Sequence, residues 1–80
     1  MDEILQKVGE LIHELFDEYD GAVTRELTAT AVPQWDSLGH VQLMVMIEQL
    51  FGIRFKREEI SEFADVGALV DAVARKTATL

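Results

Sequence analysis

Residues 35–52 read WDSLGHVQLMVMIEQLFG, and this stretch decides the fold. From Leu38 onward its apolar residues suit a helix, in which successive side chains are about 100° apart. One face of this helix, which we expect to be core, holds Leu43, Ile47, Leu50 and Phe51. A second apolar set lies where core packing does not require one, and consists of Leu38, Val41 and Val45 among Gln42, Glu48 and Gln49.

The two ends of this helix carry recognisable signals. Ser37 stands at or next to the N-cap, where serine is favoured because its oxygen accepts a hydrogen bond from a free backbone N–H. Gly52 supplies the left-handed residue that often ends a helix. The sequence therefore predicts a helix that begins near Leu38 and closes at Gly52.

Three further helices are predicted around this one. The first spans about residues 2–18, because apolar residues recur there at helical spacing: Ile4, Leu5, Val8, Leu11, Ile12, Leu15 and Phe16. A short helix covers about residues 57–63, and Asp65 is a good N-cap for a last helix. We therefore predict an all-α fold, a four-helix bundle of three longer helices and one short helix, in a single domain of residues 1–80.

The connections have no sustained period. Between the first two helices we expect Val23, Leu27 and Val32 to pack on the core, with a short helical turn somewhere within residues 24–31. Trp35 is expected to cover one end of that core. After Gly52, Ile53 and Phe55 are expected to anchor a linker, because the segment is too short to pair as a strand.

Composition excludes several classes of function. The formal charge of −8 disfavours nucleic acid and anionic membranes as partners, because both repel an acidic surface. Most of this charge, −7, lies in residues 1–36. Without cysteine there is no disulfide, thiolate metal site or cysteine nucleophile. No segment is long enough to insert across a membrane, and the start lacks the basic residues of a secretory signal, so we expect a cytoplasmic protein.

The motif Asp36-Ser37-Leu38, the apolar helix that begins there, and Phe51-Gly52-Ile53 after it resemble the acyl carrier protein family of phosphopantetheine-binding carriers. The resemblance runs from the first helix to the last. It implies that Ser37 receives 4'-phosphopantetheine from coenzyme A, with Asp36 and Leu38 as the motif flanks. It also implies that a magnesium-dependent phosphopantetheinyl transferase is a partner, and that Asp36 helps this enzyme to recognise the site.

The same resemblance implies what the carrier does. The thiol of the arm holds acyl or aminoacyl groups as thioesters and passes them between loading and processing enzymes such as a ligase, acyltransferase or ketosynthase. The pathway is fatty acid, polyketide or related biosynthesis. Gly39, Gln42 and Gln49 stand where fatty-acid carriers commonly have acids, which favours a discrete carrier of a specialised pathway. We expect a monomer with no catalysis of its own.

Two surfaces of the second helix have expected roles. The family resemblance implies that the second and third helices flank a cleft for an acyl chain, with Leu43, Ile47, Ile60 and Phe63 as candidate lining; plain core packing of these residues is the alternative. On the outward face, Leu38, Val41 and Val45 are the expected docking residues, with Asp36 and Glu48 at the edge. The alternative is that these three residues pack on the loop between the first two helices.

Two other classes of function, a small enzyme and an unmodified binding module, fit the sequence less well. Catalysis would need a base beside Ser37, and His40 follows it on the same helix. However, His40 points partly towards the core, and no Gly-x-Ser-x-Gly elbow is present. His13 and His40 are the only histidines and lie in different segments, so no metal site is expected. The runner-up is an unmodified helical module that binds partners through the second helix, with Ser37 as a plain N-cap.

Overall fold

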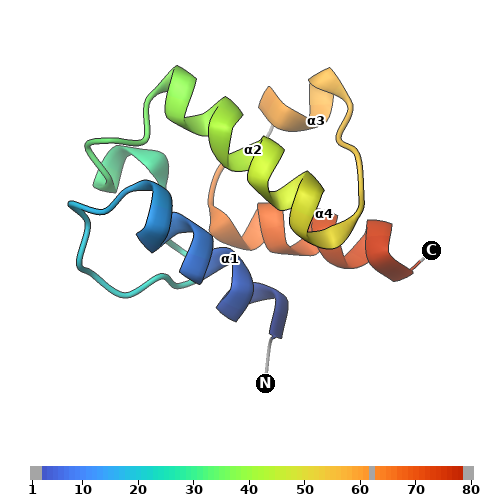
Figure 1. Ribbon diagram of the computed structural model, residues 1–80, viewed down its shortest axis with the longest axis horizontal. Coiled ribbons are helices and arrows are strands. Elements are labelled where there is room, and N and C mark those ends of the chain that lie inside the picture. Colours follow the sequence, from blue (N-terminus) through green and yellow to red (C-terminus); the bar gives the residue numbers. More distant parts are fainter. Residues whose placement is uncertain (1–2, 62, 79–80) are drawn as a thin grey trace.

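The computed structural model describes residues 3–61 and 63–78 of the chain. Three longer helices and one short one make up the bundle (Figure 1). In order they are α1 (Glu3–Leu15), α2 (Ser37–Phe51), α3 (Arg57–Ser61) and α4 (Val66–Ala78), with a 3-10 turn, η1, at Ala29–Ala31. In the view of Figure 1, α1 and α2 run in opposite directions and α4 passes behind α2. The predicted all-α class is confirmed.

The core forms where the apolar faces of α1, α2 and α4 meet. Its largest fully buried side chains are Val8, Ile12, Phe16, Val32, Leu43, Met44, Ile47, Val66, Leu69, Val70 and Val73. Trp35 is buried as predicted, and its indole stacks on Phe16 with 5.5 Å between ring centroids. The linker anchors Ile53 and Phe55 are buried too, and Asp65 caps α4 by accepting the Ala68 N–H at 2.8 Å.

Leu50 was wrongly predicted to be core, since half of its surface is exposed. The buried residues of α2 are Gly39, Leu43, Met44 and Ile47, of which Met44 was not predicted to be core. Leu50 shares the direction of this face on a helical wheel, but it lies in the last turn of α2, beyond Ile47, the last buried residue of the helix. Phe51 is partly buried and packs against the core.

Two predicted helices are too long. The first ends at Leu15, because Asp17 and Glu18 would place negative charge at the negative end of the helix dipole. Instead the backbone N–H of Glu18 donates to Gln34 Oε1 at 2.9 Å. Asp2, which was expected to start this helix, lies outside the described residues.

The third helix ends at Ser61, whose Oγ donates to Glu58 O at 3.0 Å. Phe63 then turns back and meets Phe55 edge-on, with ring centroids 5.5 Å apart. At the start of α3, Glu59 accepts the Lys56 N–H and forms an ion pair with Lys76 of α4. The Lys56 N–H and the Lys76 ammonium together lower the pKa of the Glu59 carboxyl.

The long connection between α1 and α2 is held by α4. Leu27 O accepts the N–H of Val66, and Arg25 O accepts that of Gly67, so the loop caps the first turn of α4. The Arg25 guanidinium forms two hydrogen bonds with Asp71, at 3.0 and 2.9 Å. The predicted packing of the loop on the core is confirmed, and its helical turn is limited to η1. The end of the loop is held by separate contacts with the chain after α1, because Trp35 stacks on Phe16 and Gln34 accepts the Glu18 N–H.

Candidate functional site

Asp36, and not Ser37, is the N-cap of α2. Its backbone is extended, with φ −96° and ψ −168°, and its Oδ1 accepts the Gly39 N–H at 2.8 Å. Ser37 is therefore the first residue of the helix, and its exposed hydroxyl is not needed for capping. The interpretation of Ser37 as a plain N-cap is wrong, and its placement next to the N-cap is confirmed.

Ser37 stands at the rim of a hollow. A cavity of about 360 Å³ is lined by Ala29, Trp35, Asp36, Ser37 and His40. A second, of about 310 Å³, lies beside Asp36 and Leu38 and reaches Phe16 and Gln42. A group attached to the Ser37 hydroxyl would meet no side chain that has to be displaced from the core.

Both ring nitrogens of His40 are hydrogen-bonded, so His40 cannot act as a general base for Ser37. Its Nδ1 accepts the Trp35 indole N–H at 2.9 Å, and its Nε2 donates to Ile60 O at 2.7 Å. A carbonyl only accepts and an indole N–H only donates, so the ring is neutral and carries its proton on Nε2. Both nitrogens are engaged, and neither is available to activate a hydroxyl.

Gly39 is required by close packing at the start of α2. A Cβ at this position would lie 2.7 Å from Gln34 O and 2.8 Å from Phe16 Cε1. The first of these atoms is backbone and the second belongs to a buried ring, so neither gives way easily. The acid that fatty-acid carriers commonly have at this position would not fit here without a shift.

We expect Gly39→Ala to lower the free energy of unfolding by about 1–3 kcal/mol, because overpacking a tight contact costs that much. Helix propensity alone predicts the opposite sign, a gain of about 1 kcal/mol. A urea melt measures the difference. Gln42→Ala, at an exposed position of the same helix, is the control and should change stability by less than about 0.5 kcal/mol. A Gly39→Ala protein more stable than wild type would contradict the packing argument.

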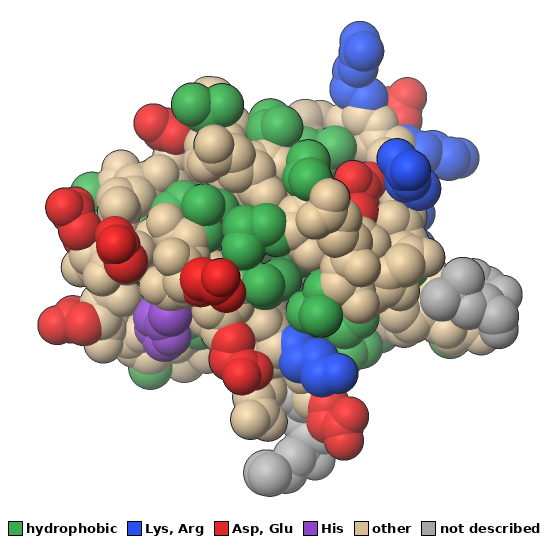
Figure 2. Space-filling model, in the orientation of Figure 1, with side chains coloured by type: hydrophobic (Ala, Val, Ile, Leu, Met, Phe, Trp, Pro, Cys, Tyr) green, Lys and Arg blue, Asp and Glu red, His purple; other side chains and the backbone are tan. Residues whose placement is uncertain are grey.

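The outward face of α2 is an exposed apolar surface. Leu38, Val41 and Val45 are 68%, 51% and 44% exposed. In Figure 2 apolar side chains gather along the face where α2 lies, with carboxylates to one side. The alternative that these residues pack on the preceding loop is therefore wrong.

Glu48, the fourth expected docking residue, already serves the chain itself. Its Oε2 accepts the Phe55 N–H at 2.8 Å, and its backbone oxygen accepts the N–H groups of Gly52 and Ile53. The side chain is half-buried. A docking role for Glu48 stays a prediction. A partner that binds Glu48 would share its carboxylate with the Phe55 N–H in the linker after α2.

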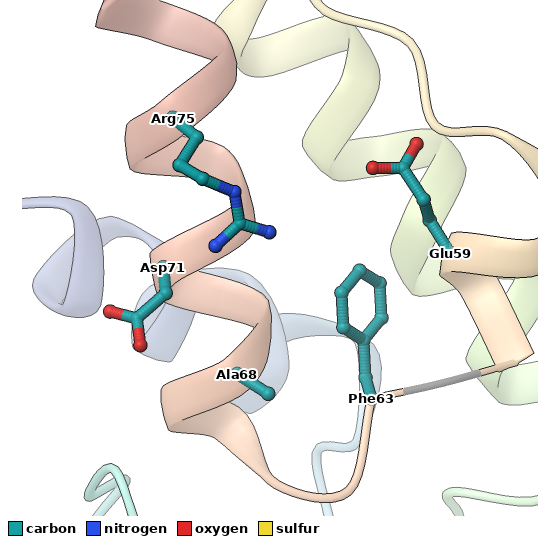
Figure 3. Close-up of a pocket in the computed structure, with 5 residues that line it drawn as sticks. All are labelled: Glu59, Phe63, Ala68, Asp71 and Arg75. Carbon is teal, nitrogen blue, oxygen red and sulfur yellow. The ribbon is translucent and has the colours of Figure 1, made fainter.

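The four candidate cleft residues differ in burial. Leu43 and Ile47 have no exposed surface, whereas Ile60 and Phe63 are partly buried against the core. Phe63 also lines a cavity of about 310 Å³ between α3 and α4, together with Glu59, Ala68, Asp71 and Arg75 (Figure 3). That cavity has charged walls and does not include Leu43 or Ile47. An acyl cleft between α2 and α3 stays a prediction.

Two further features bear on function. Within residues 3–61 and 63–78, no three His, Cys, Asp or Glu side chains are grouped so that they could hold a metal ion. Among the helices of the same residues, none has the length and apolar character needed to cross a membrane. Sequence reasoning missed the links of His40 to Trp35 and Ile60. No local sequence pattern predicts the bond between His40 and Ile60, because these residues are 20 positions apart.

Comparisons with known proteins extend over nearly the whole chain. No family model matches it. The acyl carrier protein of Acidothermus cellulolyticus is 33% identical over 76 residues, which cover 95% of this chain and 90% of the relative. That of Borreliella burgdorferi strain ZS7 is 28% identical over 75 residues, 94% of each chain.

A solved structure agrees with these relatives. The solution structure of holo acyl carrier protein from Geobacter metallireducens matches with a TM-score of 0.87 and 33% identity, over 95% of this chain and 87% of that one. The sequence and the fold therefore lead to the same family. The chain belongs to the acyl carrier proteins, which are carriers and not enzymes.

Proposed function

We propose that Ser37 receives 4'-phosphopantetheine from coenzyme A, and that the protein carries acyl groups on this arm between enzymes of a biosynthetic pathway. The observation that carries the proposal is the exposed Ser37 hydroxyl directly after the capping Asp36, in a chain that matches the family over nearly its full length. Members of the family normally carry this group.

The residues around Ser37 fit a phosphodiester. The first backbone N–H groups of a helix have no acceptor within it and lie at the positive end of its dipole, which favours a phosphate attached to the first residue. Asp36 already satisfies the Gly39 N–H, so the cap does not depend on the Ser37 oxygen. The arm, once attached, supplies a thiol that holds acyl groups as thioesters.

The transferase and the acyl-processing enzymes dock on the exposed surface formed by Leu38, Val41 and Val45. Exposed apolar groups framed by polar ones are typical of binding surfaces, and the centre of an interface is usually poor in charge. The acidic first half of the chain adds electrostatic steering that weakens with salt. This pattern supports a discrete carrier of a specialised pathway, such as polyketide or peptide synthesis, over bulk fatty acid synthesis.

Intact mass spectrometry tests the proposal directly. The purified chain is incubated with coenzyme A, magnesium and a phosphopantetheinyl transferase, and we expect a gain of one phosphopantetheine. An unchanged mass, with a known carrier modified in the same tube, would contradict the proposal. It would favour the unmodified interaction module, for which the same apolar surface of α2 is the supporting observation.

We expect Val41→Asp to slow transfer of the arm about tenfold or more, because losing about 1.4 kcal/mol of docking energy costs a factor of ten. The side chain is half exposed, so the thermal melt should stay close to that of wild type. The measurement is the initial rate of arm transfer below saturating carrier concentration.

Two control variants show whether a slower transfer results from lost docking or from the added negative charge alone. Gln6→Asp adds the same charge at an exposed position of α1 and should leave the rate near wild type. Val41→Thr keeps the shape without the charge and should slow transfer less than Val41→Asp. Unfolding by Val41→Asp, or an unchanged rate, would show that enzymes dock elsewhere.

A further inference from the structure

One side chain joins the start of α2 to the end of α3. His40 lies one helical turn after Ser37, and its Nε2 donates to Ile60 O at 2.7 Å. Among the residues that the structure describes, this is the side-chain hydrogen bond that connects α2 with α3. We refer to His40 with its bond to Ile60 as the His40 latch.

Trp35 fixes the orientation of the latch. Its indole N–H donates to His40 Nδ1 at 2.9 Å, and the two rings stack with centroids 6.1 Å apart and planes 20° apart. Trp35 is itself buried against Phe16. Since Nδ1 is occupied by this donor, the imidazole presents its Nε2–H to Ile60 and cannot exchange the two roles.

The latch lies close to the attachment site, because His40 and Ser37 line the same hollow. Leu43 and Ile47 have no exposed surface, so an acyl chain reaches them only if the helices that cover them move apart. With five residues, α3 is too short to be stable through its own hydrogen bonds, and its position depends on tertiary contacts. Opening on the Ser37 side would break the part-buried hydrogen bond from His40 to Ile60 O, and the net free energy that this bond contributes resists the opening.

We propose that the His40 latch keeps the region between α2 and α3 closed, so that cargo on the Ser37 arm stays outside the bundle. This inference rests on the proposed function and names its substrate class: short or polar acyl or aminoacyl groups, in preference to long alkyl chains. The hollow of about 360 Å³ lined by Trp35, Ser37 and His40 offers the arm a place outside the core. His40 is a positioning residue and takes no part in bond making.

Two substitutions of His40 each keep one of its two hydrogen bonds and so separate their effects. Asparagine places an acceptor near the position of Nδ1 and keeps Trp35 bonded, but is too short to reach Ile60 O. Glutamine reaches as far as Nε2 with an amide donor and keeps the bond to Ile60. The proposal predicts that His40→Asn opens the region between α2 and α3, and that His40→Gln leaves it closed.

The test loads each protein with an octanoyl or an acetyl pantetheine arm from the corresponding coenzyme A thioester. Intact mass confirms loading, so a failure of the proposed function is seen at this step. In ¹H–¹⁵N spectra of the loaded wild type we expect the Leu43 and Ile47 amides to have the same shifts with octanoyl as with acetyl. In His40→Asn the octanoyl chain should shift both amides, and in His40→Gln it should not.

Hydrogen exchange on the unloaded proteins gives a second readout. The Ile60 amide, which donates to Lys56 O, should exchange faster in His40→Asn than in wild type or His40→Gln. If His40→Asn does not fold, Trp35→Phe keeps a stacking ring and removes the indole donor, and it should show the same changes to a smaller degree. The proposal is overturned by octanoyl shifts in wild type equal to those in the variant, by identical behaviour of the Asn and Gln variants, or by no opening in either substitution.

Discussion

Ser37→Ala is expected to abolish the mass gain completely while leaving the helical content and the melt nearly unchanged. The hydroxyl oxygen is the atom that would be esterified, and alanine lacks it. Fold and cap should survive, because the capping bond of α2 runs from the Gly39 N–H to Asp36 and does not involve Ser37. Intact mass after incubation with coenzyme A and transferase measures the first effect, and circular dichroism the second.

The chain offers a matched control, because it has two serines only. Ser61 is also exposed, and it ends α3 with a hydrogen bond from its Oγ to Glu58 O. Ser61→Ala should be modified like wild type. Retention of the arm by Ser37→Ala, or its loss in Ser61→Ala, would show that the attachment site has been misassigned.

Leu43→Ala should lower the free energy of unfolding by about 2–5 kcal/mol, through lost transfer energy and the cavity left behind. Leu43 is fully buried in the face of α2 that meets the core. Domains of ordinary size have about 5–15 kcal/mol in total, so this single change removes a large share of the stability. A urea melt with a two-state fit measures it.

Leu38→Ala makes the same chemical change on the opposite face of the same helix. Leu38 is 68% exposed, so its truncation should cost less than about 0.5 kcal/mol. The contrast between the two leucines tests the orientation of α2 independently of helix propensity. Equal effects would mean that the exposed surface of α2 is covered in solution.

Much of this fold could be predicted from periodicity alone. The apolar positions of α1 and α4 recur at helical spacing, and Asp65 and Gly52 mark helix ends by local hydrogen bonding and backbone preference. The Asp36-Ser37-Leu38 motif indicated the candidate site, because it stands at the start of a helix. All of these signals lie within a few residues of the feature they predict.

The errors and omissions have a common physical origin in contacts between distant segments. Leu50 follows the helical pattern of the core, but it lies in the last turn of α2, beyond the last residue that neighbouring segments bury. The end of α1 is marked locally by the charges of Asp17 and Glu18, but it also involves a distant contact, because the Glu18 N–H bonds with Gln34, 16 residues later. The role of His40 depends on Ile60, and the need for Gly39 depends on Gln34 and Phe16.

The capping of α4 by the loop between α1 and α2 has a consequence for the order of folding. Arg25 and Asp71 are 46 residues apart, so their contact forms only after a large part of the chain has been closed into a loop. Contacts of such separation slow folding relative to purely local helix formation. We therefore expect the part of the loop around Arg25 and Leu27 to reach its native position only when α4 has docked, whereas Trp35 packs on Phe16 and Gln34 bonds with Glu18 without the help of α4.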